Sequence, residues 1–430
     1  MKINKMIKIL LFASLFYLLA GCSDADETSS SKNGDKEIKF MHLWPEGSSK
    51  QHYDVVNEII ADYEKENDGV KVDLEVLSNE QYKDKLRVLS TSKELPDVGM
   101  TWAAGFLEPY VGGNMFAPLD DVIKDQLSDS FVPGTAEAYA LDGKTYGLPL
   151  ELNIVTLYYN SAMFEEYNLE APKTFEELEN VIKVFKENGI DPIALGNKDA
   201  WTGSLWYMYL ADRLGGAEVL NKAIDRSGSF EDPALVEAAQ KVQDLVDMGA
   251  FVKGFNGLAD EEAKSMFMSE QAPMYLIATW DLPNYTTNET VPQEFRDSVQ
   301  YLKFPTVNGN GDMDSFVGGP GVGLFVAEDS DVKEEAKDFA AYFVKAWGEK
   351  AVTKAGVIPA TKVDAGSLDL PEMYIDILNE LNEASNITLF ADVQMSPDVA
   401  QVHLDSIQAL FGKEMTPEEF GKAHEDALSK

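Results

Sequence analysis

The 430-residue chain has one cysteine, Cys22, and only four histidines. A single cysteine cannot form a disulfide within the chain. The few histidines are scattered, which leaves little material for a transition-metal site. Beyond the N-terminus no run of about 18 apolar residues occurs, so the sequence predicts no second membrane segment. We therefore expect neither a disulfide framework nor a metal centre.

Positive charge is also scarce, since 36 Lys and Arg residues stand against 74 Asp and Glu residues, a net charge of −38. Nucleic acid requires a basic face to neutralise its phosphates, so this balance argues against nucleic acid as a partner. It argues equally against docking on anionic lipid through charge. A membrane location would need a different anchor.

The N-terminus supplies such an anchor. Three lysines precede an apolar run at 9–19, and small residues then lead to Cys22 in Leu-Ala-Gly-Cys. The run is too short for a permanent span, and the pattern predicts a lipoprotein signal peptide at 1–21 with a diacylated Cys22. A polar tether at 22–37 would follow. We expect a lipid-anchored protein on the extracytoplasmic face of a cell membrane, of Gram-positive type; a buried cysteine after an anchoring helix is the alternative.

From residue 38 onward, strand patterns alternate with helix patterns. Apolar strand candidates at 38–44, 70–76 and 96–100 are separated by stripes of helical spacing. This order predicts an α/β fold with a parallel sheet, whose ligands bind beyond the carboxyl ends of the strands. The residues that follow these strands include Trp44, Glu46 and Trp102.

The same alternation continues in the second half of the chain. Thr174 followed by Glu177 is typical of a capping box that opens a helix. Strand patterns are expected at 154–158 and 274–279, and residues 371–430 are predicted to be helical throughout.

A glycine cluster at 318–323 invites comparison with a dinucleotide loop. Such a loop follows a strand and opens a helix, whereas this cluster leads into a strand. We therefore expect no nucleotide and no cofactor, and predict that Gly318 and Gly319 bring the backbone close to a ligand or a crossing strand. The oxygen-rich segment at 308–314 has Met313 where a calcium loop requires glycine, and no glutamate closes the spacing, so the segment favours a hairpin turn.

Motifs of catalysis are missing from the chain. Neither a Gly-x-Ser-x-Gly elbow, nor a His-Glu-x-x-His pair, nor a phosphate-binding loop occurs. Carboxylates are so numerous that a glycosidase pair cannot be located by inspection. The sequence favours a binding protein over an enzyme.

The six tryptophans are more informative. Trp206 and Trp347 lie in apolar helical stripes and are predicted to be core. The other four stand where a strand ends or a helix begins: Trp44, Trp102, Trp201 and Trp280. Flat rings suit the apolar faces of sugars, and nearby polar side chains suit sugar hydroxyls. The polar candidates are Glu46, Asn153 and Asp281.

Several short motifs occur in a fixed order along the chain. They are Leu95-Pro96-Asp97-Val98 before Trp102, Phe116-Ala117-Pro118-Leu119-Asp120, Lys144-Thr145-Tyr146-Gly147-Leu148-Pro149, Leu157-Tyr158-Tyr159-Asn160, Pro172-Lys173-Thr174-Phe175-Glu176-Glu177-Leu178, Phe304-Pro305, Gly318-Gly319 and Val357-Ile358-Pro359-Ala360. In this order the chain resembles the extracellular solute-binding proteins of sugar-importing ABC transporters, the family typified by maltose-binding protein.

The resemblance implies a hinged, two-lobed fold of type II with a sugar in the cleft. One lobe would hold 37–150 and 306–350, and the other 151–305 and 351–430. It implies a carbohydrate ligand, a monomer, and a membrane permease partner with a separate ATPase. Tryptophans match the family's sugar positions at Trp102, Trp201 and Trp280.

The resemblance also sets the ligand apart from maltose. Glu46 and Asn153 differ in residue type from the maltose binder's lysine and glutamate, and a family aromatic near Val399 is missing. Gln394 or Asp398 is a candidate to face the cleft instead. We expect a neutral oligosaccharide; a peptide-binding protein, a lipid-anchored glycoside hydrolase and a surface adhesin remain as alternatives.

Overall fold

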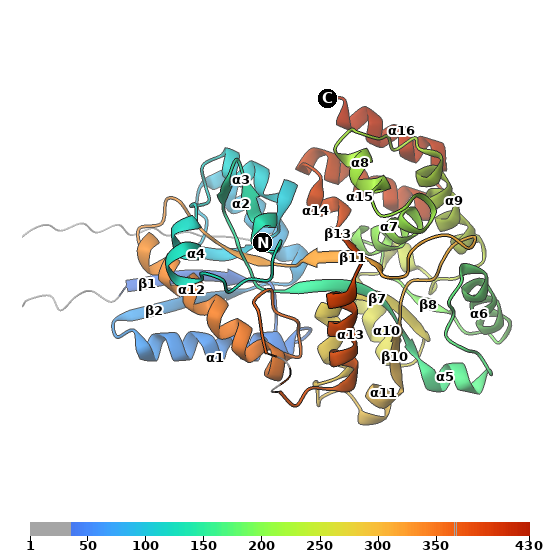
Figure 1. The fold of residues 1–430 in the computed structure, drawn as a ribbon, viewed down its shortest axis with the longest axis horizontal. Helices are drawn as coiled ribbons and strands as arrows, with labels where there is room; N and C mark the ends of the chain where they lie inside the picture. The colour runs from blue at the N-terminus through green and yellow to red at the C-terminus, as the bar shows by residue number, and fades with distance from the viewer. Residues whose placement is uncertain (1–35, 365, 367) are drawn as a thin grey trace, which may run out of the picture. The chain divides into compact units, whose positions relative to one another are not determined.

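The computed structural model describes residues 36–364, 366 and 368–430, and Cys22 lies outside these residues. Two separate sheets organise this part of the chain, each flanked by helices (Figure 1). In the part of the chain that is described, no helix combines the length and apolar character that crossing a membrane requires.

The first sheet has the strand order β2-β1-β3-β12-β6. Its strands are β1 (Lys36–His42), β2 (Val70–Val76), β3 (Val98–Thr101), β6 (Leu148–Pro149) and β12 (Gly323–Val326). β1 pairs in parallel with β2 and with β3, so the predicted β-α-β-α-β order is confirmed. β12, from later in the chain, pairs in antiparallel orientation with β3 on one side and with β6 on the other.

Helices cover this sheet by burying one apolar stripe each. In α1 the buried residues recur at helical spacing, from Val55 and Val56 through Ile59 to Tyr63. Phe40 of β1 meets helix α12 edge-on. The helices of this region are α1 (Lys50–Glu66), α2 (Asn79–Ser92), α3 (Glu108–Gly112), α4 (Asp120–Gln126) and α12 (Lys333–Lys350), and a small hairpin joins β4 (Ala140–Leu141) to β5 (Lys144–Thr145).

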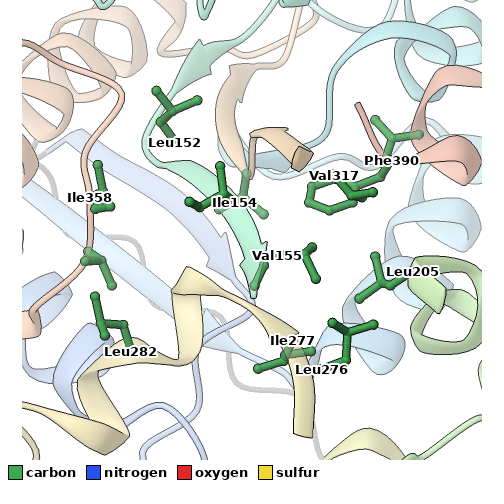
Figure 2. Packing of buried hydrophobic residues seen from close by; sticks show 14 of the residues in the cluster. Leu152, Ile154, Val155, Leu205, Leu276, Ile277, Leu282, Val317, Ile358 and Phe390 are labelled. Carbon is green, nitrogen blue, oxygen red and sulfur yellow. The ribbon is translucent and has the colours of Figure 1, made fainter. Parts of the chain in front are cut away.

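The second sheet is built around a long, almost completely buried strand, β7. Its order is β13-β11-β7-β9-β8, and β10 also pairs with β7. The bounds are β7 (Leu152–Asn160), β8 (Ile193–Ala194), β9 (Met274–Ala278), β10 (Val299–Leu302), β11 (Ser315–Pro320) and β13 (Asn386–Thr388). Figure 2 shows the core around it, which joins Ile154 and Val155 of β7 with Ile277 of β9 and Val317 of β11.

The helices of the second region include the predicted capped helix. Thr174 accepts a hydrogen bond from the backbone N–H of Glu177 at 3.2 Å, and the Glu177 carboxylate accepts one from the Thr174 N–H at 3.2 Å, which confirms the capping box. The helices are α5 (Ser161–Glu166), α6 (Phe175–Glu187), α7 (Trp201–Gly215), α8 (Val219–Ile224), α9 (Pro233–Asp247), α10 (Asp260–Met268), α11 (Gln293–Ser298), α13 (Glu372–Glu383), α14 (Ala391–Gln394), α15 (Pro397–Phe411) and α16 (Pro417–Leu428).

One of the predicted helical regions contains a strand. β13 lies within 371–430, where only helices were expected, and it pairs in parallel with β11. The segment is short and contains the β-branched pair Ile387 and Thr388, which fits a strand edge. Its partner is some 70 residues away in sequence, so local periodicity carried no signal of the pairing.

The chain passes between the two sheets at 150–151, at 321–322 and again near 358–360. The first and last of these segments lie side by side, since the Ala360 N–H donates to the Leu150 carbonyl at 2.9 Å and the Leu152 N–H donates to the Ile358 carbonyl at 3.0 Å. The expected boundary at 306 is too early, because β11 still pairs with β7 of the second sheet.

Candidate ligand-binding cleft

A cleft with a cavity volume of about 180 Å³ lies where elements of the two sheet regions face each other. A single ordered water needs only about 10–15 Å³, so the cleft admits a ligand far larger than an ion. On the first side it is lined by the residues that follow β1 and β3 and by residues of α1 and α2. On the second side it is lined by the start of α7, by α10, by α14 and by the residues after β9. This matches the expectation that ligands bind beyond strand ends.

Aromatic rings form much of the second wall. Trp201 opens α7 and meets Trp280 edge-to-face, with ring centroids 6.0 Å apart and an interplanar angle of 63°. Trp280 in turn contacts Phe390, just before α14, at 5.7 Å. Both tryptophans are half-buried, so part of each ring stays open to the cleft. Phe390 is an aromatic lining residue that the sequence analysis did not single out.

Trp102 stands on the first wall, directly after β3. It packs edge-on against Phe106 at 4.9 Å, and the Lys83 ammonium lies 5.1 Å from its ring centroid. The ring is half-buried and lines the cleft. Trp102 therefore shares the cleft with the tryptophans of the second wall, although they are far apart in sequence.

Trp44 also reaches the cleft but belongs mainly to the core. It is 5% exposed and stacks on Trp347, with centroids 4.6 Å apart and planes 10° from parallel. Trp347 and Trp206 are fully buried, as predicted. Most of the Trp44 ring is therefore used in packing.

Asn153, at the start of β7, offers a donor at the floor of the cleft. The Ile154 N–H donates to the Thr279 hydroxyl at 3.2 Å, and that hydroxyl donates to the side-chain amide oxygen Oδ1 of Asn153 at 3.0 Å. The Asn153 amide nitrogen is left buried, with no hydrogen-bond partner among the described residues. Such a group carries a desolvation cost until a ligand or water meets it.

Glu151 and His52 form a second polar group at this floor, one that the sequence analysis missed. The His52 Nε2 and Glu151 Oε1 atoms are 3.1 Å apart, but neither is aligned for a hydrogen bond with any described residue. Both side chains are buried and line the cleft. Glu151 lies two residues before Asn153, and the period of two along an extended segment was a usable signal that both face the same way.

Asp281 lines the cleft, and both of its carboxylate oxygens already accept hydrogen bonds from neighbouring side chains. Lys264 Nζ lies 2.9 Å from its Oδ1, the Asn284 amide donates to the same oxygen at 2.8 Å, and the Tyr285 hydroxyl donates to Oδ2. Burial by itself lowers the pKa of Lys264, but the carboxylates of Asp281 and Asp260 raise it to about 12. Asp281 thus holds other side chains in place around Trp280.

The cleft is acidic. Its charged lining consists of Glu80, Glu151, Asp199, Asp260, Glu261, Asp281 and Asp392 against Lys83 and Lys264. Burial raises the pKa of Asp260 to about 7 and also raises the pKa of Asp392. An anionic ligand would meet uncompensated negative charge here.

Several of the expected site residues stand away from the cleft. Glu46 is exposed and does not line it. Gly318 and Gly319 lie within β11, where a Cβ on Gly318 would come within 2.2 Å of the Asn153 carbonyl oxygen and Gly319 has a φ of +125°. Gly318 therefore allows β11 to approach β7, and Gly319 has a backbone conformation that favours glycine; neither residue lines the cleft.

The two candidates near the C-terminus also lie elsewhere. The Gln394 amide donates to the Leu389 carbonyl at 2.6 Å and to Asn221 at 3.2 Å, and Asp398 is exposed in the first turn of α15. The neighbouring residues Asp392 and Val393 line the cleft instead. Within the described ranges, no three His, Cys, Asp or Glu residues are grouped to hold a metal ion.

We compared the chain with known proteins and found a matching family and similar relatives. The family model described as bacterial extracellular solute-binding protein matches residues 47–347. The multiple sugar-binding protein of Streptococcus mutans is 25% identical over 354 residues, which are 80% of this chain and 80% of that protein.

Solved structures agree closely with the fold. One, from work on xylan utilization by the thermophilic bacterium Caldanaerobius polysaccharolyticus, is 33% identical and has a TM-score of 0.85, covering 91% of this chain and 99% of that one. A chitin oligosaccharide binding protein is 24% identical with a TM-score of 0.84, covering 92% and 99% of the two chains.

Proposed function

Because the chain belongs to the bacterial extracellular solute-binding protein family, we propose that it captures a neutral oligosaccharide in the cleft and delivers it to the permease of an ABC importer. The observation that carries the proposal is the juxtaposition of half-buried tryptophans on both walls with unpartnered polar atoms at the floor. Rings contact the faces of pyranoses, and polar atoms meet their hydroxyls.

The binding energy of such a site is plausible in magnitude. Micromolar affinity corresponds to about 8 kcal/mol. Single neutral hydrogen bonds contribute only about 1 kcal/mol each, so stacking and apolar burial on Trp102, Trp201 and Trp280 must supply much of the total. The donor of Asn153 and the acceptor of Glu151 would then fix which hydroxyls fit.

Capture without chemistry follows from the two walls. A sugar that contacts Trp102 on one side and Trp280 on the other binds the closed arrangement better than an open one, and so shifts the population toward it. The closed complex is the form that the permease recognises, and a separate ATPase drives import. We propose that the protein acts as a monomer and is not an enzyme.

The charge of the cleft favours a neutral ligand. Seven carboxylates and two lysines line it. A uronate would add a further negative charge without an arginine to pair it, whereas sugar hydroxyls can donate to carboxylates. We therefore expect neutral oligosaccharides to bind and oligogalacturonates to be rejected.

Calorimetry with xylotetraose, chitotetraose, maltotetraose and tetragalacturonate tests this function. Xylo-oligosaccharide is included because of the structural neighbour from xylan utilization. Binding of a neutral sugar with compaction in small-angle scattering is the expected result. Chromatographic detection of sugar cleavage would instead favour a glycoside hydrolase, binding without compaction an adhesin, and binding of a peptide panel alone a peptide transporter.

We further propose that the protein is anchored through a diacylglyceryl group on Cys22. The basic and apolar residues before Cys22 support this location. Two acyl chains suffice for stable anchoring, whereas one does not. The Cys22→Ser variant should leave the membrane fraction for the medium, while Ser23→Ala should stay bound; a membrane-bound Cys22→Ser protein would contradict the lipid anchor.

A further inference from the structure

A chain of hydrogen bonds leads from the cleft into the C-terminal helices. The Ser204 hydroxyl of α7 lies 2.7 Å from His403 Nε2 of α15. His403 Nδ1 lies 2.9 Å from His424 Nε2 of α16, and His424 Nδ1 lies 2.8 Å from the Phe420 carbonyl oxygen. Ser204 is 1% exposed and both histidines are fully buried. This series of hydrogen bonds thus includes two of the four histidines of the protein.

The Phe420 carbonyl at the end of this series of hydrogen bonds determines which atom donates and which accepts in each of them. A carbonyl only accepts, so His424 Nδ1 must carry a proton. Burial lowers the pKa of His424 to about 4 and the pKa of His403 well below its usual range, so each ring is neutral near pH 7 and carries a single proton. His424 Nε2 therefore accepts from His403 Nδ1, and His403 Nε2 accepts from the Ser204 hydroxyl.

Ser204 stands on the cleft-facing side of α7. Trp201, Ser204, Leu205 and Met208 recur at helical spacing, and all four line the cleft. The only proton of the Ser204 hydroxyl is committed to His403, so the lone pairs of its oxygen are what it offers to a partner in the cleft.

We propose that the His403–His424 pair holds Ser204 as an obligatory hydrogen-bond acceptor, which selects a ligand that presents a hydroxyl or amide N–H at this point. The inference rests on the proposed function of sugar capture. Ser204 is the residue that determines specificity, and His403 and His424 are positioning residues. A sugar whose corresponding oxygen is etherified has no proton to donate and is discriminated against.

The same Ser–His contact could suggest a hydrolase, but its surroundings oppose proton transfer. A serine nucleophile needs a histidine that becomes a cation, stabilised by a carboxylate on its other nitrogen. Here the other nitrogen of His403 faces the neutral ring of His424, and burial disfavours the charged form. The hydrogen bonds from Ser204 to His403 and from His403 to His424 therefore hold the Ser204 hydroxyl proton in place and do not transfer it.

The first part of the test needs no sugar. Nitrogen-15 NMR of the histidine rings at pH 7 should show His403 and His424 as neutral tautomers protonated on Nδ1. A His403 ring protonated on Nε2 would overturn the proposal, because Ser204 would then accept from His403 and be free to donate into the cleft.

The second part measures binding of xylotetraose, chitotetraose and maltotetraose by calorimetry. Ser204→Ala should weaken binding about fivefold or more. His403→Leu should weaken it similarly, and His403→Gln should restore it to within about twofold, since a glutamine can accept from Ser204 and donate to His424. Thr202→Val, which removes a buried hydroxyl of the same helix bonded at 2.6 Å to the Gly196 carbonyl, should leave affinity unchanged.

The outcomes separate the two proposals. If the wild-type protein binds none of the three sugars, the proposed function fails and this inference fails with it. If the wild type binds and Ser204→Ala binds equally well, or if His403→Gln is as weak as His403→Leu, only the assignment of Ser204 and its positioning histidines is overturned.

Discussion

Two pairs of tryptophans, one in the core beside the cleft and one in its wall, show how differently the same residue type can be used. Trp44 and Trp347 are stacked nearly parallel and are 5% and 0% exposed, whereas Trp201 and Trp280 meet edge-to-face and remain half-buried. In the first pair the two ring faces pack against each other. In the second pair part of each ring remains exposed and can contact a ligand. A position after a strand thus brings a tryptophan to the cleft, and its packing partners decide whether it can bind there.

The largest expected effect is on stability. Trp347→Ala should lower the free energy of unfolding by about 3–5 kcal/mol, because it leaves a cavity beneath Trp44. Urea denaturation followed by circular dichroism measures this. Trp280→Ala is the matched comparison and should cost less than about 1 kcal/mol, as expected for a partly exposed ring. Equal losses in the two variants would remove the distinction between the pairs.

Acidification should change the free energy of unfolding in opposite directions through a titratable group near each pair: His42 beside Trp44, and Asp260 in the cleft that Trp280 lines. Burial, with a smaller contribution from His52, lowers the pKa of His42 beside Trp44 to about 3. The neutral ring is favoured in the folded state, so its stabilising contribution is complete above pH 6.5 and is lost as the pH falls toward 3. The loss should reach about 3 kcal/mol by pH 4.5.

Asp260, which lines the cleft as Trp280 does, behaves in the reverse manner. Its pKa is raised to about 7 by burial, so its contribution to stability grows as the pH falls below 7 and is lost as the pH rises through 7. Unfolding free energies of wild type, His42→Gln and Asp260→Asn between pH 4.5 and 8 test both signs. His42→Gln should reduce the acid loss, part of which remains because burial also lowers the pKa of His403 and of His424. Asp260→Asn should remove the decline in stability that accompanies a rise in pH toward 7, above which the contribution of Asp260 no longer changes. Parallel curves for all three proteins would contradict both assignments.

The next effect is on affinity. Trp280→Ala should weaken binding of the best oligosaccharide at least tenfold, about 1.4 kcal/mol, because the stacked sugar face loses its ring. Trp347→Phe, which keeps an aromatic side chain in the core, should bind with unchanged affinity. Calorimetry on both variants distinguishes a binding ring from a packing ring, and an unaltered Trp280→Ala protein would refute the stacking assignment.

The smallest effect concerns Trp102. The Lys83 ammonium lies 5.1 Å from its ring centroid and 3.5 Å from the Glu80 carboxylate. A cation–π contact at a partly exposed site contributes about 0.5–1 kcal/mol. Lys83→Met, which keeps the stem and removes the charge, should weaken sugar binding about two- to fivefold, and Lys83→Arg should not. A larger loss in Lys83→Arg than in Lys83→Met would mean that Lys83 does not act through the ring.

Local patterns were sufficient for much of the fold. Alternating apolar residues and helical stripes predicted the parallel core of the first sheet, and the spacing of Thr174 and Glu177 predicted the start of α6. The buried positions of Trp206 and Trp347 also followed from their helical stripes. β13 was missed because a strand of three residues acquires its identity only from its distant partner, β11.

The features of the cleft likewise fall into those that local sequence patterns predict and those that depend on tertiary packing. The positions of the tryptophans after strand ends or at helix starts can be predicted from chain order and periodicity, because these are local properties. Three features follow from tertiary packing instead: Trp44 stacks on Trp347, Gly318 allows β11 to approach Asn153, and Glu151 meets His52 at the floor of the cleft. These contacts join residues far apart in the chain, and burial and proton direction exist only once the elements have packed.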